Sequence, residues 1–551
     1  MTVHLFEQKL KNILKSILGS AHAQSRGAVS AFCNSDLSFG DYGSNILFLI
    51  AKKKKISPQD AYYLIATYLE KIPEIASSSF KNGFLNVTLH ERIFFQDIKT
   101  IIRTPKAYLC SDIGRGKKII IEFVSANPTG PLTLGNARAA VLGDALSKIL
   151  SFSGFRVTRE YYVNDRGVQT EMLAKSTKAA LGIIDEEEAF YKGAYVKDLS
   201  LTYAEKIKKT DDNAALGKYL ADIILESYIK QHLKAFGTQY DKFFFETELY
   251  RSNLSKKVMA HLEKKNLVLK KDGAVWIALT SIGDPKDEVI IKSNGEFTYF
   301  WSDILYHYDK VFIRKSAVLN LLGADHLDHA RRLKSVFEKI FSVSPHDFRF
   351  IVYQMVNLVK NGEIMRMSKR KGNFITLDEL LSETGIDPIR FFFLKYSPDS
   401  TVEFDMNVAK KDSQENPIWY IHYASVRMRK ILEKAAALHH LTVSPRSDLA
   451  KAFHPLIKNE LYAPLIRRIH QLPDLVTGIA RDLHAHALPQ WFYEFSKQVH
   501  AFYEKEHVVP DIIADEEQKN LIKQKLIFVQ ALHNILLLGI DLLGLTAKQK
   551  L

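Results

Sequence analysis

A strand, a turn rich in glycine and proline, and a helix follow one another over residues 117–150. The run 119–124 is apolar except for Glu122, so it predicts a covered parallel strand that holds one costly carboxylate. Residues 127–131 interrupt the chain, and a helix is predicted from Asn136 to Gly154. Unpaired N–H groups and the positive end of the helix dipole attract anions at such a junction. The segment therefore predicts a phosphate site, and the alternative is an ordinary turn without a ligand.

Met367, Ser368 and Lys369 stand in a basic loop, KNGEIMRMSKRKGNFI, that follows a predicted strand. A flexible lysine can reach the β- and γ-phosphates of a nucleotide and stabilise the charge that develops on departing pyrophosphate. The tripeptide alone says little, but it follows the anion-binding turn within one α/β unit. It predicts a clamp on a nucleotide, and the alternative is a solvated basic loop.

The elements that must position these residues predict three units. Residues 1–105 predict a small α+β unit of helices, a loop at SFGDYGSN and a strand at FLNVTLH. Residues 106–395 predict a doubly wound α/β fold with strands at RVTREYYV, AVLNLLGAD and FRFIVYQMVNLV, and with a helical insertion at about 171–285 that includes a hairpin turning at Asp272-Gly273. Residues 396–551 change to successive helices and predict an all-α bundle.

Composition limits the classes of partner and of cofactor. The chain has 551 residues, 76 of them Lys or Arg and 62 Asp or Glu, with a formal net charge of +14. A chain of this length is too long for a single hydrophobic core, and its positive charge favours a polyanion such as RNA as its partner. Cys33 and Cys110 stand far apart without metal-ligand spacing, so we expect free thiols in a reducing cytoplasm and no structural metal.

Two apolar stretches resemble membrane signals only superficially. The start, LFEQKLKNILKSILG, is interrupted by lysines and predicts an amphipathic helix rather than a signal sequence. Near the other end, LIFVQALHNILLLGIDLLGL contains Gln530, His533, Asn534 and Asp541. A core helix of the bundle is therefore expected rather than a membrane span, and we expect no membrane partner.

The segment EFVSANPTGPLTLGNARAA resembles the first signature of class I aminoacyl-tRNA synthetases, and in particular that of the arginyl family, which ends in His-x-Gly-His. Here Thr133, Leu134, Gly135 and Asn136 fill those four places, a form that is similar to the Thr-x-Gly-Asn of tryptophanyl relatives. A hydroxyl and an amide can still donate hydrogen bonds to phosphate or ribose. RMSKR resembles the second class I signature, Lys-Met-Ser-Lys-Ser.

Both ends of the chain carry further resemblance to the arginyl family. FGDY and GF-x-N resemble phrases of its N-terminal additional domain, which contacts the elbow of tRNA, although a small domain without a ligand would look the same. Asn416-Pro417 with Tyr420 and Tyr423 resembles its helical anticodon-binding domain. Trp419, Tyr423 and Arg427 are candidates for stacking on bases and pairing with phosphates, whereas in most bundles such residues are half core and half surface.

The resemblance implies ligation of arginine to tRNA at the expense of ATP. It implies ATP binding, as a complex with Mg²⁺, by Thr133, Gly135, Asn136, Met367, Ser368 and Lys369, and catalysis by Lys369, Thr133 and Asn136. A guanidinium is a planar fork of donors that carboxylates and a phenol can match. Tyr299 and Asp303 are four residues apart and share a face if their segment is helical.

The resemblance also implies which residues bind arginine, and two other functions stay open. The resemblance implies recognition of the guanidinium by Glu122, Tyr299 and Asp303, and of the α-amino and carboxylate groups by Asn127 and His326. An internal salt bridge is the alternative for Glu122, and a helix cap with a packed aromatic is the alternative for Tyr299 and Asp303. We expect a cytoplasmic monomer; the rival functions are a non-catalytic tRNA-binding paralogue and a class I synthetase for another amino acid.

Overall fold

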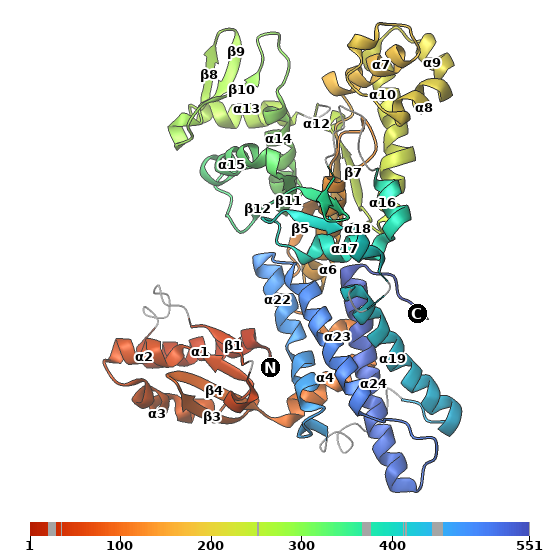
Figure 1. Ribbon diagram of the computed structural model, residues 1–551. Coiled ribbons are helices and arrows are strands. Elements are labelled where there is room, and N and C mark those ends of the chain that lie inside the picture. The colour runs from red at the N-terminus through yellow and green to blue at the C-terminus, as the bar shows by residue number, and fades with distance from the viewer. Residues whose placement is uncertain are drawn as a thin grey trace.

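The computed structural model describes residues 1–19, 29–34, 36–250, 253–365, 376–411, 413, 416–443 and 456–549. Figure 1 shows an N-terminal unit beside a helical bundle, with the α/β unit above the bundle. Two smaller lobes, one of a sheet with helices and one of helices alone, extend beyond the α/β unit. This arrangement confirms the predicted fold class: a doubly wound α/β unit, an N-terminal α+β unit and a C-terminal all-α bundle.

The N-terminal unit packs three helices on a four-stranded antiparallel sheet of order β1-β2-β4-β3. Its elements are α1 (Val3–Leu18), β1 (Ala31–Cys33), η1 (Leu37–Phe39), β2 (Tyr42–Ser44), α2 (Ile46–Lys54), α3 (Pro58–Leu69), β3 (Ile75–Lys81) and β4 (Phe84–Leu89). The segment SFGDYGSN, predicted as a loop, contributes β2 to this sheet. Three residues of strand are too few to show an alternating pattern.

The next two helices lie against the bundle, although the sequence analysis included most of them in the N-terminal unit. They are α4 (Glu91–Arg103) and α5 (Pro105–Tyr108). Asn534 Nδ2 donates a hydrogen bond of 3.0 Å to the carbonyl of Ile101, and the Tyr108 hydroxyl donates one of 2.9 Å to the carbonyl of Ile469. Figure 1 shows α4 among the helices of the bundle. These contacts hold α4 and α5 against helices of the C-terminal bundle.

A five-stranded parallel sheet of order β12-β11-β5-β6-β7 forms the centre of the α/β unit. Its strands are β5 (Lys118–Glu122), β6 (Arg156–Val163), β7 (Lys242–Phe245), β11 (Ala317–Gly323) and β12 (Phe348–Tyr353). Ile119, Ile120 and Ile121 of β5 are all buried. Strands of a parallel sheet are covered on both faces, which explains why three apolar residues follow one another here without alternation. Helix α6 (Leu134–Phe152) crosses from β5 to β6.

The predicted insertion at about 171–285 is not continuous, because β7 interrupts it and joins the central sheet. Before β7 come α7 (Val168–Ala180), η2 (Glu186–Glu188), α8 (Ala194–Thr202), α9 (Ala204–Lys208), α10 (Asn213–Ile224), η3 (Leu225–Ile229) and α11 (Lys230–Ala235). After it come α12 (Thr247–Tyr250), α13 (Leu254–Lys264), β8 (Val268–Lys271), β9 (Ala274–Ile277), η4 (Thr280–Ile282) and β10 (Glu288–Ile291). The predicted hairpin turn is confirmed, since Asp272 and Gly273 have φ of 53° and 75° between β8 and β9.

The strand predicted at FRFIVYQMVNLV is two strands in two sheets. β12 ends at Tyr353, and β13 (Val356–Lys360) lies between β14 (Glu363–Ile364) and β15 (Val402–Asp405). The break at Gln354 has a tertiary cause: the buried Arg138 guanidinium donates to the carbonyls of Gln354, Ser397 and Ser400. A side chain from α6 thus fixes where the strand ends.

The polypeptide between the two lobes and the bundle adds helical elements to the strands β11 to β15. It comprises α14 (Tyr299–Tyr308), the π-helical η5 (Asp309–Ile313), η6 (Ala324–His326), α15 (Leu327–Ser335), η7 (Val336–Ile340), α16 (Leu377–Thr384), α17 (Ile386–Lys395) and α18 (Met406–Lys410). The bundle contains α19 (Pro417–His439), α21 (Ala463–His470), α22 (Leu472–Asp482), α23 (Ala487–Lys505) and α24 (Glu516–Leu543). Helix α24 is long and apolar enough to cross a membrane, yet 72% of its most apolar window is buried in the protein, so it is the core helix of the bundle.

Candidate active site

A cavity of about 780 Å³ opens at the carboxyl ends of β5, β11 and β12, where open α/β sheets bind ligands. It collects every candidate site residue of the α/β unit outside the basic loop. These are Glu122, Asn127, Thr133, Gly135, Asn136, Tyr299, Asp303 and His326. Residues as far apart in the sequence as Glu122 and His326 therefore share one cavity.

The turn between β5 and α6 is conformationally unusual. Val124 and Ser125 have φ of 71° and 38°, a region that residues with a side chain rarely adopt. Ser125 holds the turn in place, because its hydroxyl donates to Glu122 Oε1 (3.0 Å) and accepts from the backbone N–H of Tyr162 (3.1 Å). Such strain is typical of binding sites, where the surrounding structure maintains it.

Helix α6 begins two residues before the predicted start, because Thr133 is its N-cap. Thr133 and Asn136 form a capping box: the backbone N–H and the hydroxyl of Thr133 each donate to Asn136 Oδ1 at 2.9 Å. The cap uses the oxygen of Asn136 and leaves its Nδ2 amide without a hydrogen bond to the described part of the chain. A Cβ on Gly135 would meet only Thr133 Oγ1, at 3.8 Å, so space above the helix N-terminus stays open. An anion fits there.

Glu122, which lines the cavity, forms an internal salt bridge. Its Oε2 accepts from Lys310 Nζ at 2.5 Å, and the Lys310 side chain is fully buried. Lys310 also donates to Asn320 Oδ1 (3.3 Å) and lies 3.9 Å from the centre of the Tyr306 ring. The internal salt bridge, which was the alternative interpretation of Glu122, is therefore present, and the Glu122 carboxylate also lines the cavity.

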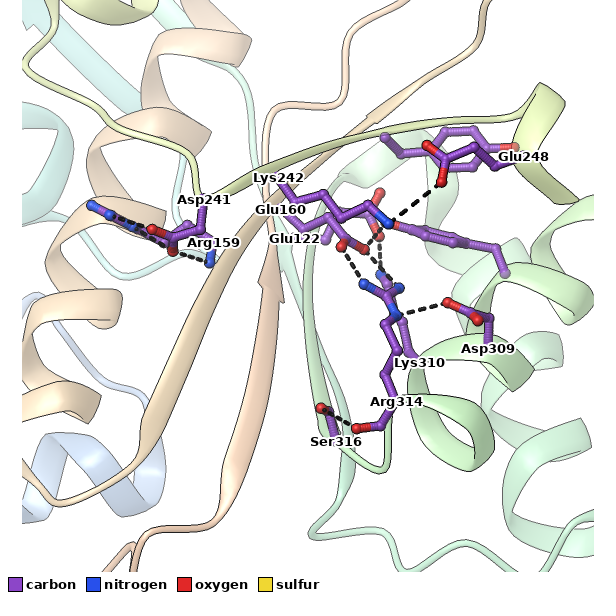
Figure 2. Close-up of polar contacts among 12 residues, drawn as sticks. Glu122, Arg159, Glu160, Asp241, Lys242, Glu248, Asp309, Lys310, Arg314 and Ser316 are labelled. Atoms are coloured by element: carbon purple, nitrogen blue, oxygen red, sulfur yellow. Dashed lines mark hydrogen bonds and ion pairs between the residues drawn. The ribbon is translucent and has the colours of Figure 1, made fainter.

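A second buried glutamate repeats this pairing on the next strand. Glu160 stands beside Glu122 in the β5–β6 register, and Arg314 donates to both of its oxygens, as Figure 2 shows. The Tyr306 hydroxyl adds a hydrogen bond of 2.7 Å. Burial raises the pKa of Glu160, but the hydrogen bond from Arg314 and the charges of Lys310 and Arg314 outweigh burial, so the pKa lies below its usual value. Two cations one helical turn apart thus fix α14 and η5 against the sheet.

Helix α14 carries the other wall of the cavity. Tyr299 and Asp303 share one face of it, as their spacing predicts, and Thr298 caps the helix through the N–H of Trp301. Tyr299 lies at the mouth with 56% of its surface exposed. Asp303 Oδ2 lies 2.5 Å from Nε2 of His329 on α15. His329 was not among the predicted residues, although its spacing of three from His326 at the start of a helix is a signal that could have identified it.

Comparison with known proteins identifies the family. A model described as tRNA synthetases class I (R), catalytic domain, matches residues 98–387; an arginyl tRNA synthetase N terminal domain matches 4–89, and a DALR anticodon binding domain matches 421–551. The arginine–tRNA ligase of Moorella thermoacetica is 36% identical over 94% of this chain and 92% of its own length. The chain belongs to the arginyl-tRNA synthetase family. The arginine–tRNA ligase of Dehalococcoides mccartyi is 34% identical over 98% of this chain and 99% of its own length.

The fold agrees with that of a solved member of the family. The arginyl-tRNA synthetase of Thermus thermophilus superposes with a TM-score of 0.75 over the whole of both chains, at 19% identity. That likeness concerns the fold alone. The family models and the curated relatives confirm the recognition made from the two signatures.

The second signature of this family member, with Met367, Ser368 and Lys369, lies outside the described residues, which stop at 365 and resume at 376. Strand β14 ends just before the gap, and α16 begins just after it. Among the described residues, no group of three or more His, Cys, Asp or Glu side chains is placed to hold a metal ion.

The candidate tRNA contacts form a cluster between α19 and α23. The rings of Trp419 and Tyr423 are 4.4 Å apart between centres. The guanidinium of Arg427 lies 4.1 Å from the Tyr423 ring and 4.4 Å from the Tyr503 ring, and donates to the Tyr423 hydroxyl. All three predicted residues are half-buried. Their stacking faces are partly used within the protein, so any base would meet only the edge of the cluster.

Proposed function

We propose that this arginyl-tRNA synthetase family member attaches L-arginine to tRNA through an arginyl-adenylate, with ATP as its complex with Mg²⁺. The observation that carries the proposal is the one cavity that the N-terminus of α6 and the residues Glu122, Asp303 and Tyr299 line together. Phosphates suit the first and a guanidinium suits the second. The family membership supports the same reaction.

The first step needs no general base, because the carboxylate of arginine is ionised at neutral pH. One of its oxygens attacks the α-phosphorus of ATP, the bond from that phosphorus to the bridging oxygen breaks, and pyrophosphate leaves. In the second step the terminal ribose hydroxyl of tRNA attacks the carbonyl carbon, and AMP leaves. The protein contributes positioning and charge stabilisation.

We assign the roles as follows. Asp303, Tyr299 and Glu122 hold the guanidinium, Asn127 and His326 hold the α-amino and carboxylate groups, and Thr133, Gly135 and Asn136 hold the nucleotide. Met367, Ser368 and Lys369 close on its phosphates. Trp419, Tyr423 and Arg427 contact tRNA.

Exchange of radiolabelled pyrophosphate into ATP tests the function directly. We expect exchange with arginine as the amino acid and only when tRNA is bound, as is general in the family. Exchange with another amino acid would indicate a synthetase of different specificity. Absence of exchange from folded protein that still binds tRNA would indicate a non-catalytic paralogue.

We also propose that the protein is a cytoplasmic monomer. Light scattering would test the monomeric state, and cell fractionation would test the cytoplasmic location.

Replacing Lys369 with alanine should lower the rate of arginine activation about 10²-fold, because one preorganised contact to the transition state is lost. Arginine binding should remain, since the lysine acts on pyrophosphate. Single-turnover formation of the adenylate measures the rate. Lys371→Ala is the matched control in the same loop, and full activity of Lys369→Ala would remove the clamp hypothesis.

Replacing Thr133 with alanine should remove the cap of α6, costing about 1 kcal/mol of stability, and should raise KM for ATP more than KM for arginine. The reason is that the cap orients both Asn136 and the first N–H groups of the helix. Melting temperature and the two KM values measure this. Ser57→Ala removes the side-chain cap of α3 in the N-terminal unit and should cost similar stability without a change in KM for ATP. Equal changes in the two variants would refute a role for Thr133 in nucleotide binding.

A further inference from the structure

His329 is a titratable side chain in direct contact with Asp303, the carboxylate that we assign to the guanidinium of arginine. It stands on α15, and its Nε2 lies 2.5 Å from Asp303 Oδ2 on α14. Both side chains are 29% exposed and line the cavity. The centres of the Phe300 and His329 rings are 5.7 Å apart, and the two planes are nearly perpendicular. The histidine therefore occupies one oxygen of the carboxylate that we assign to the guanidinium.

The groups around His329 leave Asp303 as its one ionic partner among the described residues. Helix α14 contributes Asp303 and the buried His307, which donates through Nδ1 to the carbonyl of Asp303. Segment η6 contributes Asp325 and His326, which face each other at 3.5 Å. Toward the cavity, β11 presents Leu321, Leu322 and Gly323, and β12 presents Tyr353, whose pKa burial raises to about 12.

The charge state of His329 follows from these neighbours. Burial lowers the pKa of His329, but the hydrogen bond to Asp303 and the charge of Asp303 outweigh burial, so the pKa lies above its usual value. The contact with Asp303 thus favours the imidazolium form of His329 in the free protein. A guanidinium that enters the cavity meets a carboxylate already paired with a cation, and like charges in one site repel each other.

We propose that His329 is a specificity-determining residue, which releases a proton when the guanidinium of arginine pairs with Asp303. The inference rests on the proposed function. The imidazolium loses the proton on Nδ1 to water, the neutral ring keeps its Nε2–H hydrogen bond to Oδ2, and the guanidinium donates to Oδ1. One cation enters and one proton leaves, so the charge of the site is conserved.

Specificity follows from the same exchange. A cationic side chain gains from deprotonation of His329, whereas citrulline, which is uncharged, releases no proton. Preference for arginine over citrulline should therefore weaken as the pH falls through the pKa of His329. By linkage, KM for arginine should rise up to about tenfold for each pH unit below that pKa, while KM for ATP should not change with it.

Calorimetric titration of the full-length protein with arginine, in two buffers of different ionisation enthalpy, measures the protons released. We expect release of up to one proton from the wild type and none from His329→Gln, whose amide still donates to Asp303. KM for arginine should rise at low pH in the wild type and stay flat in the variant, with kcat retained. His484→Gln, an exposed histidine of the bundle, is the matched control and should behave as the wild type.

The outcomes separate this inference from the proposed function. Arginine binding without proton release in the wild type, or the same rise of KM with falling pH in His329→Gln, would overturn the inference alone. No arginine binding at any pH, with or without tRNA, would overturn the proposed function and the inference with it. The wild-type measurement decides even if the variant does not fold.

Discussion

Replacing Asp303 with asparagine should lower kcat/KM for arginine about 10³-fold, because a partly buried carboxylate that pairs with a substrate cation is lost. The wild type should reject citrulline by about 10⁴, since that uncharged analogue leaves the polar groups of the site unpaired. In Asp303→Asn this discrimination should shrink to about tenfold or less, because the site has lost the anion that favours a charged side chain over a neutral one. Pyrophosphate exchange with each amino acid measures both quantities.

A control on the same helical segment separates charge from packing. Asp309→Asn is isosteric in the same way, but Asp309 pairs with Arg314, as Figure 2 shows, and is not among the residues that line the cavity. It should leave kcat/KM for arginine within about threefold of the wild-type value, as expected of a partly exposed pair. Unchanged arginine activation in Asp303→Asn would show that our assignment of this residue is wrong.

Replacing Lys310 with methionine should destabilise the protein by about 3–5 kcal/mol, because Glu122 would be left as an uncompensated buried charge. The Glu122 side chain is 10% exposed and the Lys310 side chain is fully buried. KM for arginine should also rise, since Lys310 joins α14 and η5 to β5 and so holds Asp303 in the cavity wall. Thermal melting of the full-length protein and arginine kinetics measure the two effects.

Two further variants make this prediction falsifiable. Lys242→Met removes a cation from an exposed pair with Glu248, at 3.5 Å, and should cost less than about 1 kcal/mol. The double variant Glu122→Gln, Lys310→Met removes both charges and should recover much of the lost stability. If the double variant is as unstable as Lys310→Met alone, lost packing rather than an uncompensated charge is the cause.

The local elements around the site could be predicted from sequence because their causes are local. An apolar run followed by glycine and proline predicts β5 and its turn, and an Asp-Gly pair between short apolar runs predicts the hairpin of β8 and β9. A spacing of four on a helical segment predicts that Tyr299 and Asp303 share a face. Each of these patterns depends on residues within a few positions of one another.

The sequence by itself also determined the family and hence the function, because the two class I signatures and the arginyl phrases are short motifs that can be identified without coordinates. It determined that the bundle has an apolar core helix. The positions that the anion-binding turn would use were likewise visible, although the capping of α6 by Thr133, rather than a start at Asn136, emerged from the hydrogen bonds.

Only the tertiary structure decided which distant groups meet. Glu122 and Lys310 are 188 residues apart, and no periodic pattern connects them. The short β7 lies in a stretch that otherwise predicts helices, and the break between β12 and β13 depends on Arg138 from another element. The pairing of His329 with Asp303 is of the same kind. Periodicity reports how one element meets the core, whereas the partner of a buried charge is chosen by three-dimensional packing, because burial makes an unpaired charge costly wherever its partner stands in the sequence.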